Sequence, residues 1–226
     1  MNLLILGAGK TGSLVADVAR EHHHQVRVLR AAENPHGAAL TADNLRDTAV
    51  VTDFTNPHAV RENISACIRA RKNIVVGTTG WYGDLENVRR EVEQAGTGLL
   101  FGANFSFGVN LFFEVARVSA AALKHGYKGQ IFERHHVHKK DAPSGTALAI
   151  QKIVRDSGGE ELEITSFREG EAVGMHELIF ECPADRIYLC HDAQSRRGFA
   201  EGAVRAAEWL VGRTGFYDFK DVWRQL

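Results

Sequence analysis

The sequence is poor in cysteine and proline and has no long apolar run. Its 226 residues include only three cysteines and four prolines. Cys67, Cys182 and Cys190 are odd in number and lack the spacing of a metal-binding motif, so neither a disulfide framework nor a cysteine-ligated metal is expected. We therefore expect reduced thiols and a cytoplasmic protein.

An excess of charge of one sign is also absent. The chain has 27 basic and 28 acidic residues and a formal net charge of −1, which gives no electrostatic reason to expect a nucleic acid or a membrane as partner. No segment approaches the roughly 18 consecutive apolar residues of a membrane span. The opening MNLLILGAG has no basic region and only a short apolar run, so it is not expected to be a secretory signal.

Short apolar runs and amphipathic segments alternate through the first half of the chain. Strands that alternate with helices predict a parallel sheet wound on both faces. The expected strands are 2–6, 25–29, 49–54, 73–76 and 98–101, and the expected helices are 13–21, 57–71 and 84–96.

The pattern changes after about residue 107. Helices are expected at 108–126, 145–158 and 199–213, and strands at 130–138, 162–169, 175–182 and 185–192. Closely spaced strands predict an open antiparallel or mixed sheet. The fold class is therefore α/β: a doubly wound Rossmann domain over residues 1–106, and a second α+β domain for substrate binding and oligomerisation over 107–192. Residues 193–226 are expected to form a C-terminal helix that returns to the first domain.

A glycine motif, GAGKTG, stands between the first strand and the first helix. Gly7, Gly9 and Gly12 have the G-x-G-x-x-G spacing, which allows a tight turn, a close approach of a pyrophosphate and close helix packing. A tight turn without a ligand is the alternative. The position between strand and helix favours dinucleotide binding at 7–12, including Ala8, Lys10 and Thr11.

The end of the second strand bears on which dinucleotide binds. NAD sites usually place a carboxylate here for the ribose hydroxyls, but Leu29 is followed by Arg30, and the nearest acid is Glu33. Arg30 could pair with a 2′-phosphate, or it could be a solvated surface residue. NADPH and NADH therefore both remain possible cofactors.

Two further small-residue loops follow predicted strands. Ligands bind at the carboxyl edge of such sheets, so the backbone of these loops is expected to reach the nicotinamide, with the ring of Phe105 stacking on it. The residues concerned are Gly77, Thr78, Thr79, Gly102, Ala103, Asn104 and Phe105.

The stretch HHVHKKDAPSGTA, residues 135–147, admits a metal site, a proton-transfer site or an anion pocket. Only His136 and His138 could converge from one strand face, and the adjacent lysines would repel a dication, so no metal is expected. The separate tract His22–His24 is expected to be a solvated turn.

An anion pocket suits the same stretch better. Ser144 or Thr146 can cap a helix, which would leave the backbone amides of Ser144, Gly145 and Thr146 as free donors at a positive helix end. Lys139 and the histidines could then exchange protons with a bound anion. A basic surface loop that caps an ordinary helix is the alternative.

These residues resemble the 4-hydroxy-tetrahydrodipicolinate reductase (dihydrodipicolinate reductase) family. HHVHKKDAPSGTA is similar to its long signature, and DFTNP, GTTG, ANFSFGVN and FAEGAVRAAEWL occur in the family's order. The resemblance implies an oxidoreductase of the diaminopimelate route of lysine biosynthesis, which uses NAD(P)H to reduce a cyclic imine dicarboxylate with loss of water. It also implies a homo-oligomer, commonly a tetramer.

The resemblance further implies roles for individual residues. His135 matches a proton donor or acceptor and Lys139 a proton donor, while His136, Gly145, Thr146 and Arg196 match the substrate contacts. The chain is short for this family, which puts the oligomer geometry in doubt. A dehydrogenase of another small dicarboxylate and a non-catalytic NAD(P)H sensor are the two alternatives.

Overall fold

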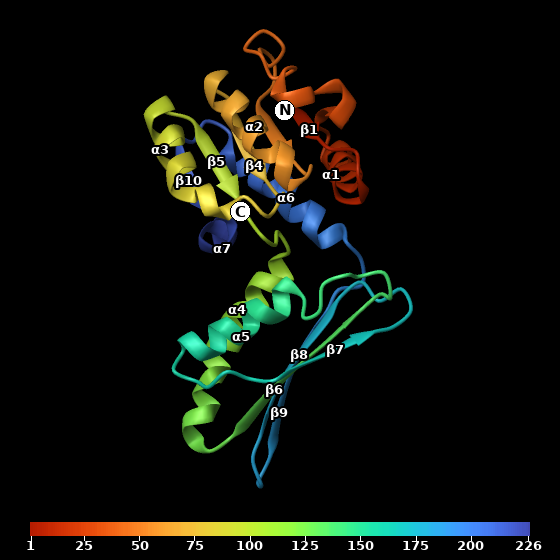
Figure 1. The fold of residues 1–226 in the computed structure, drawn as a ribbon, viewed down its shortest axis with the longest axis vertical. Coiled ribbons are helices and arrows are strands. Elements are labelled where there is room, and N and C mark those ends of the chain that lie inside the picture. The colour runs from red at the N-terminus through yellow and green to blue at the C-terminus, as the bar shows by residue number, and fades with distance from the viewer. The chain divides into compact units, whose positions relative to one another are not determined.

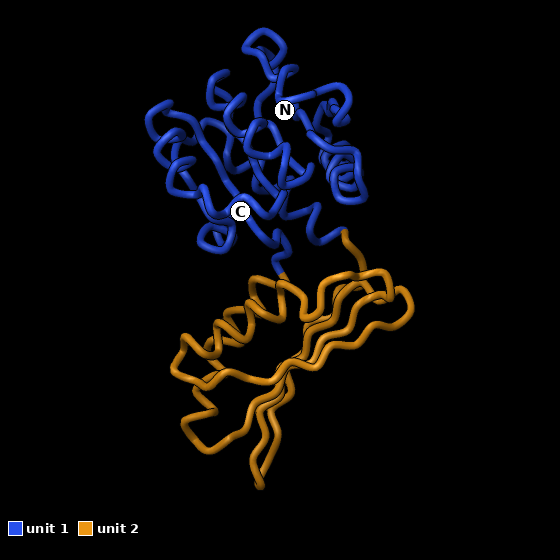
Figure 2. Tube along the Cα trace, viewed as in Figure 1, with its two compact units in different colours: residues 1–107, 197–226 blue, residues 108–196 orange.

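The computed structural model describes all 226 residues and divides into two compact units (Figure 2). Unit 1 comprises residues 1–107 and 197–226, and unit 2 comprises residues 108–196. The boundaries expected from the sequence lay after residues 106 and 192. The C-terminal segment, expected as a helix that returns to the first domain, belongs to unit 1 from Arg197 onward.

Unit 1 is built on a six-stranded parallel sheet with the order β10-β5-β4-β3-β1-β2 (Figure 1). Its strands are β1 (Asn2–Leu6), β2 (Gln25–Leu29), β3 (Val50–Asp53), β4 (Asn73–Val76), β5 (Gly98–Phe101) and β10 (Gly215–Asp218). Its helices are α1 (Lys10–Glu21), α2 (Pro57–Arg69), α3 (Leu85–Ala95), α6 (Arg197–Leu210) and α7 (Phe219–Val222).

Two hydrophobic clusters cover the two faces of this sheet. Residues of α1 and α6 pack with one set of strand side chains, including Leu3 and Ile5. Residues of α2 and α3 pack with the alternate set, including Leu4 and Leu6. Strands buried on both faces explain why their sequences are continuous apolar runs. The doubly wound fold predicted from the sequence is confirmed.

Helix α6 packs closely against the rest of unit 1. A Cβ atom on Gly202 would lie 1.8 Å from the carbonyl oxygen of Phe105, so only glycine allows the helix to cross the loop after β5 at this distance. The same helix packs against α1. Strand β10, which follows it and pairs with β5, was not predicted.

Unit 2 has a four-stranded mixed sheet with the order β7-β6-β8-β9. Its elements are α4 (Phe107–Ser119), a 3-10 helix (Ala120–His125), β6 (Lys128–His135), α5 (Gly145–Asp156), β7 (Ile164–Arg168), β8 (Met175–Glu181) and β9 (Arg186–Asp192). Strands β6 and β7 are parallel, whereas β8 is antiparallel to both β6 and β9. The open mixed sheet predicted from the sequence is confirmed.

One face of the unit 2 sheet packs against α4 and α5 through residues such as Ile131, Leu178 and Phe180. The opposite face presents Phe132 and Phe167, whose stacked rings lie 6.4 Å apart, and the exposed Tyr188. No helix of unit 2 contributes a core residue to that face. Across the whole chain, none of the helices combines the length and apolar character that a membrane crossing would need.

Candidate active site

The three motif glycines of unit 1 lie at the carboxyl end of β1 and differ in what surrounds them. Gly7 has a φ of 99°, and a Cβ on it would lie 2.3 Å from the carbonyl oxygen of Phe54. A Cβ on Gly12 would lie 2.0 Å from the carbonyl oxygen of Gly7. A Cβ on Gly9, in contrast, would meet nothing within 4 Å. The first and third glycines therefore permit the turn and its packing, while the second faces open space that suits a pyrophosphate.

The other predicted residues of this loop are accessible. Ala8 and Lys10 are exposed, Thr11 is half-buried, and α1 begins at Lys10 with Gly9 as its N-cap. No side chain caps this helix. Its first amides are therefore donors directed at the open space above Gly9, as an anion site at a helix N-terminus requires.

A pocket of about 420 Å³ adjoins the glycine loop. It is lined by Ala8, by residues of α1, and by Arg30 and Glu33 beyond β2. The carboxylate of Glu33 accepts a hydrogen bond from the backbone N–H of Arg30 at 2.8 Å. A cation and a carboxylate thus line one pocket, so groups that suit a 2′-phosphate and groups that suit ribose hydroxyls are both present.

The loop after β4 is held by a buried carboxylate that sequence reasoning did not assign to the site. Asp53 is fully buried and accepts hydrogen bonds from the hydroxyl of Thr78 at 2.6 Å and the amide of Asn63 at 2.7 Å. The backbone N–H of Thr55 donates to the Thr78 hydroxyl. The Thr78 side chain therefore holds the loop, while Thr79 is exposed at the same sheet edge as Gly77.

The expectation that the Phe105 ring stacks on a nicotinamide is wrong. Phe105 is 3% exposed, and its ring lies 4.8 Å from that of Phe219 and 6.2 Å from that of Phe54. This core packing comes from the C-terminal segment, which the sequence pattern did not connect to the loop. Gly102 is also buried, whereas Ala103 is exposed and Asn104 half-buried after β5.

The HHVHKKDAPSGTA stretch of unit 2 is organised around Glu133, a second buried carboxylate that was not predicted. Its carboxylate is fully buried and accepts hydrogen bonds from the backbone N–H of Ser144 at 3.1 Å and from Nη2 of Arg168 at 3.0 Å. Burial raises the pKa of Glu133, but the bonds from Ser144, Ser166 and Arg168 outweigh it, so the pKa is lowered. Glu133 is therefore ionised at neutral pH.

Ser144 cannot contact a substrate directly, contrary to expectation. It is 2% exposed and its N–H is bonded to Glu133. Its hydroxyl caps α5 by accepting from the N–H of Ala147, and it lies 3.1 Å from Nε2 of His176. The next two residues, Gly145 and Thr146, have backbone N–H groups without a partner within the protein, and a Cβ on Gly145 would meet nothing within 4 Å. Two of the three expected donors at this helix end therefore remain available.

Cationic groups belong to the segment between β6 and α5 or contact it. Nη2 of Arg196 lies 3.2 Å from Nε2 of His136, and both residues are half-buried. Nζ of Lys139 donates to Asp141 at 2.8 Å, and the side chain of Lys139 is 23% exposed. The ammonium lowers the pKa of Asp141. An arginine, a histidine, a lysine and two amides are a set that can bind a dicarboxylate.

His135 is more enclosed than expected for a residue that exchanges protons with a substrate. It is 7% exposed, its ring meets that of His176 edge to face at 5.1 Å, and Nδ1 lies 3.3 Å from the Glu133 carboxylate. Burial lowers the pKa of His135, although Glu133 opposes the shift. His135 is therefore a neutral imidazole at pH 7.

The metal-ligating atoms of Glu133, His135 and His176 lie within 4.8 Å of one another. The Glu133 carboxylate is already bonded to the Arg168 guanidinium, and a cation bound there would be repelled by that group. Period-two alternation places Glu133 and His135 on one strand face, so this grouping could have been found in the sequence. His176 could not, because it is opposite Glu133 only through the β6–β8 register.

We expect unit 2 to lose stability as the pH falls from about 6.5 to about 4. Burial lowers the pKa of His176 to about 4, so the unfolded chain takes up a proton that the folded unit excludes. The stabilisation is fully present above the unfolded pKa and is lost on acidification, by about 3 kcal/mol for His176 alone. Urea unfolding followed by hydrogen exchange in unit 2 measures this. His176→Gln should make the free energy of unfolding less dependent on pH, whereas His23→Gln, at an exposed site, should not. An equal pH dependence in both variants would show that His176 is not responsible.

A parallel sheet with a glycine-rich phosphate loop, joined to a unit with a cationic helix end, defines a nicotinamide-dependent oxidoreductase of the Rossmann class. Comparison with known proteins narrows this class. The N-terminal and C-terminal domain profiles of dihydrodipicolinate reductase match residues 1–105 and 108–223. The chain belongs to the dihydrodipicolinate reductase family.

Individual relatives agree with the family profiles. The chain is 39% identical over 214 residues to a 4-hydroxy-tetrahydrodipicolinate reductase of Laribacter hongkongensis, covering 86% of this chain and 78% of the relative. It is 32% identical over 236 residues to one from Christiangramia forsetii, covering 98% and 97%. This second relative is of similar length to the chain, whereas the relative from Laribacter hongkongensis is longer. A dipicolinate-bound dihydrodipicolinate reductase from Paenisporosarcina sp. TG-14 shares the fold, with a TM-score of 0.79, 22% identity and coverage of 98% and 99%.

Proposed function

We propose that this chain reduces 4-hydroxy-tetrahydrodipicolinate to tetrahydrodipicolinate with NAD(P)H, in the diaminopimelate route of lysine biosynthesis. The observation that carries the proposal is the α5 helix end, where the backbone amides of Gly145 and Thr146 are free. Lys139 and His136 belong to the segment that leads into this helix, and His136 contacts Arg196. This set is suited to a dicarboxylate. Family membership supports the reaction, and the open glycine loop supports the cofactor.

Carboxylate binding is assigned to the amides of Gly145 and Thr146 and to the side chains of His136 and Arg196. Backbone amides at a helix N-terminus are donors at a fixed position, and the helix dipole favours a negative charge there. Ser144 fixes the start of α5, because its hydroxyl caps the helix and its backbone N–H donates to Glu133. Fixing both carboxylates orients the ring for reaction, which contributes much of the rate.

Cofactor binding is assigned to unit 1. Pyrophosphate binding is assigned to Ala8, Gly9, Lys10 and Thr11, and the uncapped start of α1 and the open space at Gly9 support this. The backbones that follow β4 and β5 are at the same sheet edge and are assigned to the nicotinamide end. When bound, the reduced nicotinamide supplies a hydride to the conjugated imine.

Proton delivery is assigned to Lys139 rather than His135. Loss of the 4-hydroxyl group as water gives the conjugated imine. Addition of hydride to this imine then moves an electron pair to the far end of the conjugated system, which must take up a proton. The Lys139 ammonium is partly exposed and is paired with Asp141, so its N–H groups can reach a bound ligand. His135 is nearly buried and neutral, so it is assigned to positioning through its contacts with Glu133 and His176.

The test is the oxidation of NADH and NADPH by the purified chain with freshly generated 4-hydroxy-tetrahydrodipicolinate. Rapid oxidation that depends on this substrate is the expected result. Cofactor binding without oxidation would favour the NAD(P)H sensor, and oxidation only with another dicarboxylate would favour the related dehydrogenase. Either result would reject the proposed substrate.

Arg30→Ala should raise the KM for NADPH by roughly 10- to 100-fold and leave the KM for NADH nearly unchanged. A hydrogen bond to a charged group contributes about 1.5–3 kcal/mol, and only NADPH carries the 2′-phosphate that Arg30 would meet in its pocket. Arg27→Ala, at an exposed position on β2 that does not line the pocket, is the matched control. Equal effects on both cofactors would show that Arg30 does not read the phosphate.

The proposal includes a homo-oligomer, with a tetramer favoured, and a cytoplasmic location. The uncovered face of the unit 2 sheet supports self-association, since it carries Phe132, Phe167 and Tyr188. Aromatic side chains are typical of protein interfaces. Sedimentation equilibrium tests this part of the proposal, and a monomer at micromolar concentration would contradict it.

A further inference from the structure

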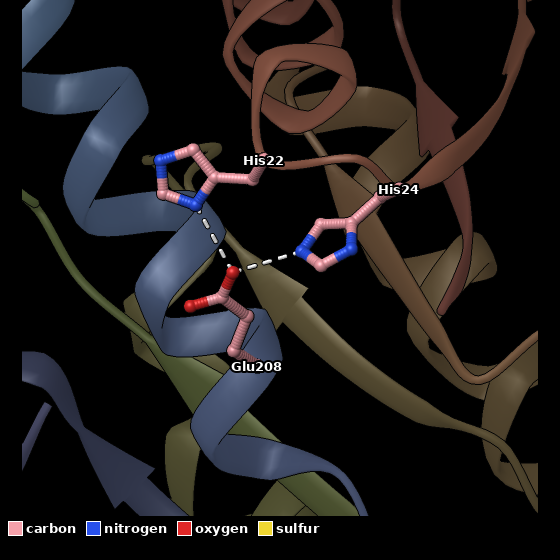
Figure 3. A group of neighbouring side chains, drawn as sticks. All are labelled: His22, His24 and Glu208. Atoms are coloured by element: carbon pink, nitrogen blue, oxygen red, sulfur yellow. Dashed lines mark hydrogen bonds and ion pairs between the residues drawn. The ribbon is translucent and has the colours of Figure 1, made fainter.

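The tract His22–His24 is not the solvated turn that the sequence suggested. Helix α1 ends at Glu21, and His23 has a φ of 61° in the left-handed region. This turn leaves His23 exposed and brings the two flanking rings toward Glu208 on α6 (Figure 3). The sequence could not reveal this contact, because Glu208 lies more than 180 residues away along the chain.

The three side chains converge on one point. Nδ1 of His22 lies 3.1 Å from Oε1 of Glu208, and Nε2 of His24 lies 2.8 Å from the same oxygen. The three potential ligand atoms all lie within 4.8 Å of one another. Around a tetrahedral Zn²⁺ with bonds of about 2.0–2.1 Å, neighbouring ligand atoms are roughly 3.3 Å apart. Small side-chain movements would therefore bring all three atoms to one ion.

The second nitrogen of His22 supplies an independent reason for a cation. Nε2 of His22 lies 3.1 Å from a carboxylate oxygen of Glu201, so both ring nitrogens face carboxylates. A neutral imidazole has only one N–H, and one carboxylate would then face a lone pair. A positive charge at Nδ1, either a proton or a metal ion, resolves this conflict. Glu201 would then accept from Nε2, as a carboxylate behind a metal-bound histidine does.

We propose that His22, His24 and Glu208 form a binding site for a divalent transition metal of the Zn²⁺ type, with solvent as a further ligand. Imidazole and carboxylate ligands suit Zn²⁺, and also Ni²⁺ and Co²⁺. The side chains are 25%, 13% and 33% exposed, so an ion can enter from solvent. The Met1 ammonium lies 3.3 Å from Nδ1 of His24. This nitrogen carries the proton when Nε2 binds a metal, so metal binding requires Met1 to turn away from the ring. The site lies outside the proposed catalytic residues, and its role is to join the end of α1 to α6.

The site can be tested by isothermal titration of Zn²⁺ into chelator-treated, untagged protein. Wild type and His23→Gln should each bind one equivalent with micromolar or tighter affinity. His24→Gln and Glu208→Gln should weaken that binding at least tenfold. His23 is the matched control because it belongs to the same tract but lies outside the cluster. All of these variants keep the exposed Cys190, so the comparison between them also corrects for any Zn²⁺ bound by that thiol.

A second measurement uses only proteins in which His22, His24 and Glu208 are intact. Zn²⁺ should raise the Tm of wild type and of His23→Gln, and Co²⁺ should give the intense visible absorption of a tetrahedral site. Absence of saturable binding to wild type would overturn the proposal and leave a proton between His22 and Glu208. Equal weakening by His23→Gln would also overturn the proposal, because the metal would then bind to the tract His22–His24 alone and not to the cluster with Glu208. NADPH oxidation should be unchanged in Glu208→Gln, so this test is independent of the proposed function.

Discussion

Lys139→Ala should lower kcat by roughly 10²- to 10⁴-fold, the usual contribution of a positioned general acid, with NADPH binding unchanged. Lys139 carries the accessible ammonium beside the α5 helix end, and its partner Asp141 holds it there. The cofactor residues belong to unit 1, whereas Lys139 belongs to unit 2. Steady-state kinetics and a separate NADPH titration measure the two effects.

Two neighbouring variants make this experiment specific. Lys140→Ala removes an exposed charge from the same stretch and should change kcat by less than about threefold, because exposed charges contribute little. Lys139→Arg keeps the positive charge but replaces the ammonium with a guanidinium that hardly deprotonates. Its KM for the substrate should therefore equal that of wild type, whereas its kcat should stay low. Normal turnover by Lys139→Ala would remove the proton-donor assignment.

Glu133→Ala should lower the free energy of unfolding of unit 2 by about 3–5 kcal/mol, the usual effect of removing one partner of a buried ion pair. The substitution leaves Arg168 and the Ser144 N–H without their shared acceptor. We also expect a large loss of kcat/KM, because Ser144 caps the helix whose amides we propose to bind the substrate. Glu133→Gln should have a smaller effect of the same sign, since it keeps one acceptor oxygen.

The measurement must report on unit 2 alone. All three tryptophans, Trp81, Trp209 and Trp223, are in unit 1, so their fluorescence would miss the change. Hydrogen exchange of the amides in β6 and α5 resolves it. Glu181→Gln is the control, since Glu181 and Arg186 form an exposed pair that should contribute no more than about 1 kcal/mol. If both substitutions lowered the free energy of unfolding equally, Glu133 would not stabilise unit 2 more than an exposed carboxylate does.

Most of unit 1 could be predicted because its strands are buried on both faces. Their apolar runs and the intervening amphipathic helices are local signals, and the glycine spacing marks the first turn. β10 was missed because GFYD is short and half-buried, and only its pairing with β5 makes it a strand. Phe105 was misassigned for a related reason, since its partner Phe219 follows that unrecognised strand.

The candidate site likewise contains some residues that the sequence predicted and others that it could not predict. Lys139, Gly145 and Thr146 stand in one local motif, so their types and spacing were informative. The free amide predicted for Ser144 was wrong because it depended on Glu133, whose burial is a tertiary property. His22 and His24 were misjudged because Glu208 reaches them only when α6 packs on α1. Contacts distant along the chain leave no periodic signal.

The return of residues 197–226 to unit 1 has a consequence for synthesis on the ribosome. A nascent chain made only as far as residue 196 contains all of unit 2. It lacks both α6, which covers one sheet face, and β10, which pairs with the open edge of β5. Until those residues emerge, Leu3, Ile5 and Leu100 have an incomplete cover, and β5 is a bare edge of the kind that pairs with other chains. Unit 2 is therefore complete along the chain before unit 1 is, and the earlier half of the chain is exposed to misassociation until residues 197–226 emerge.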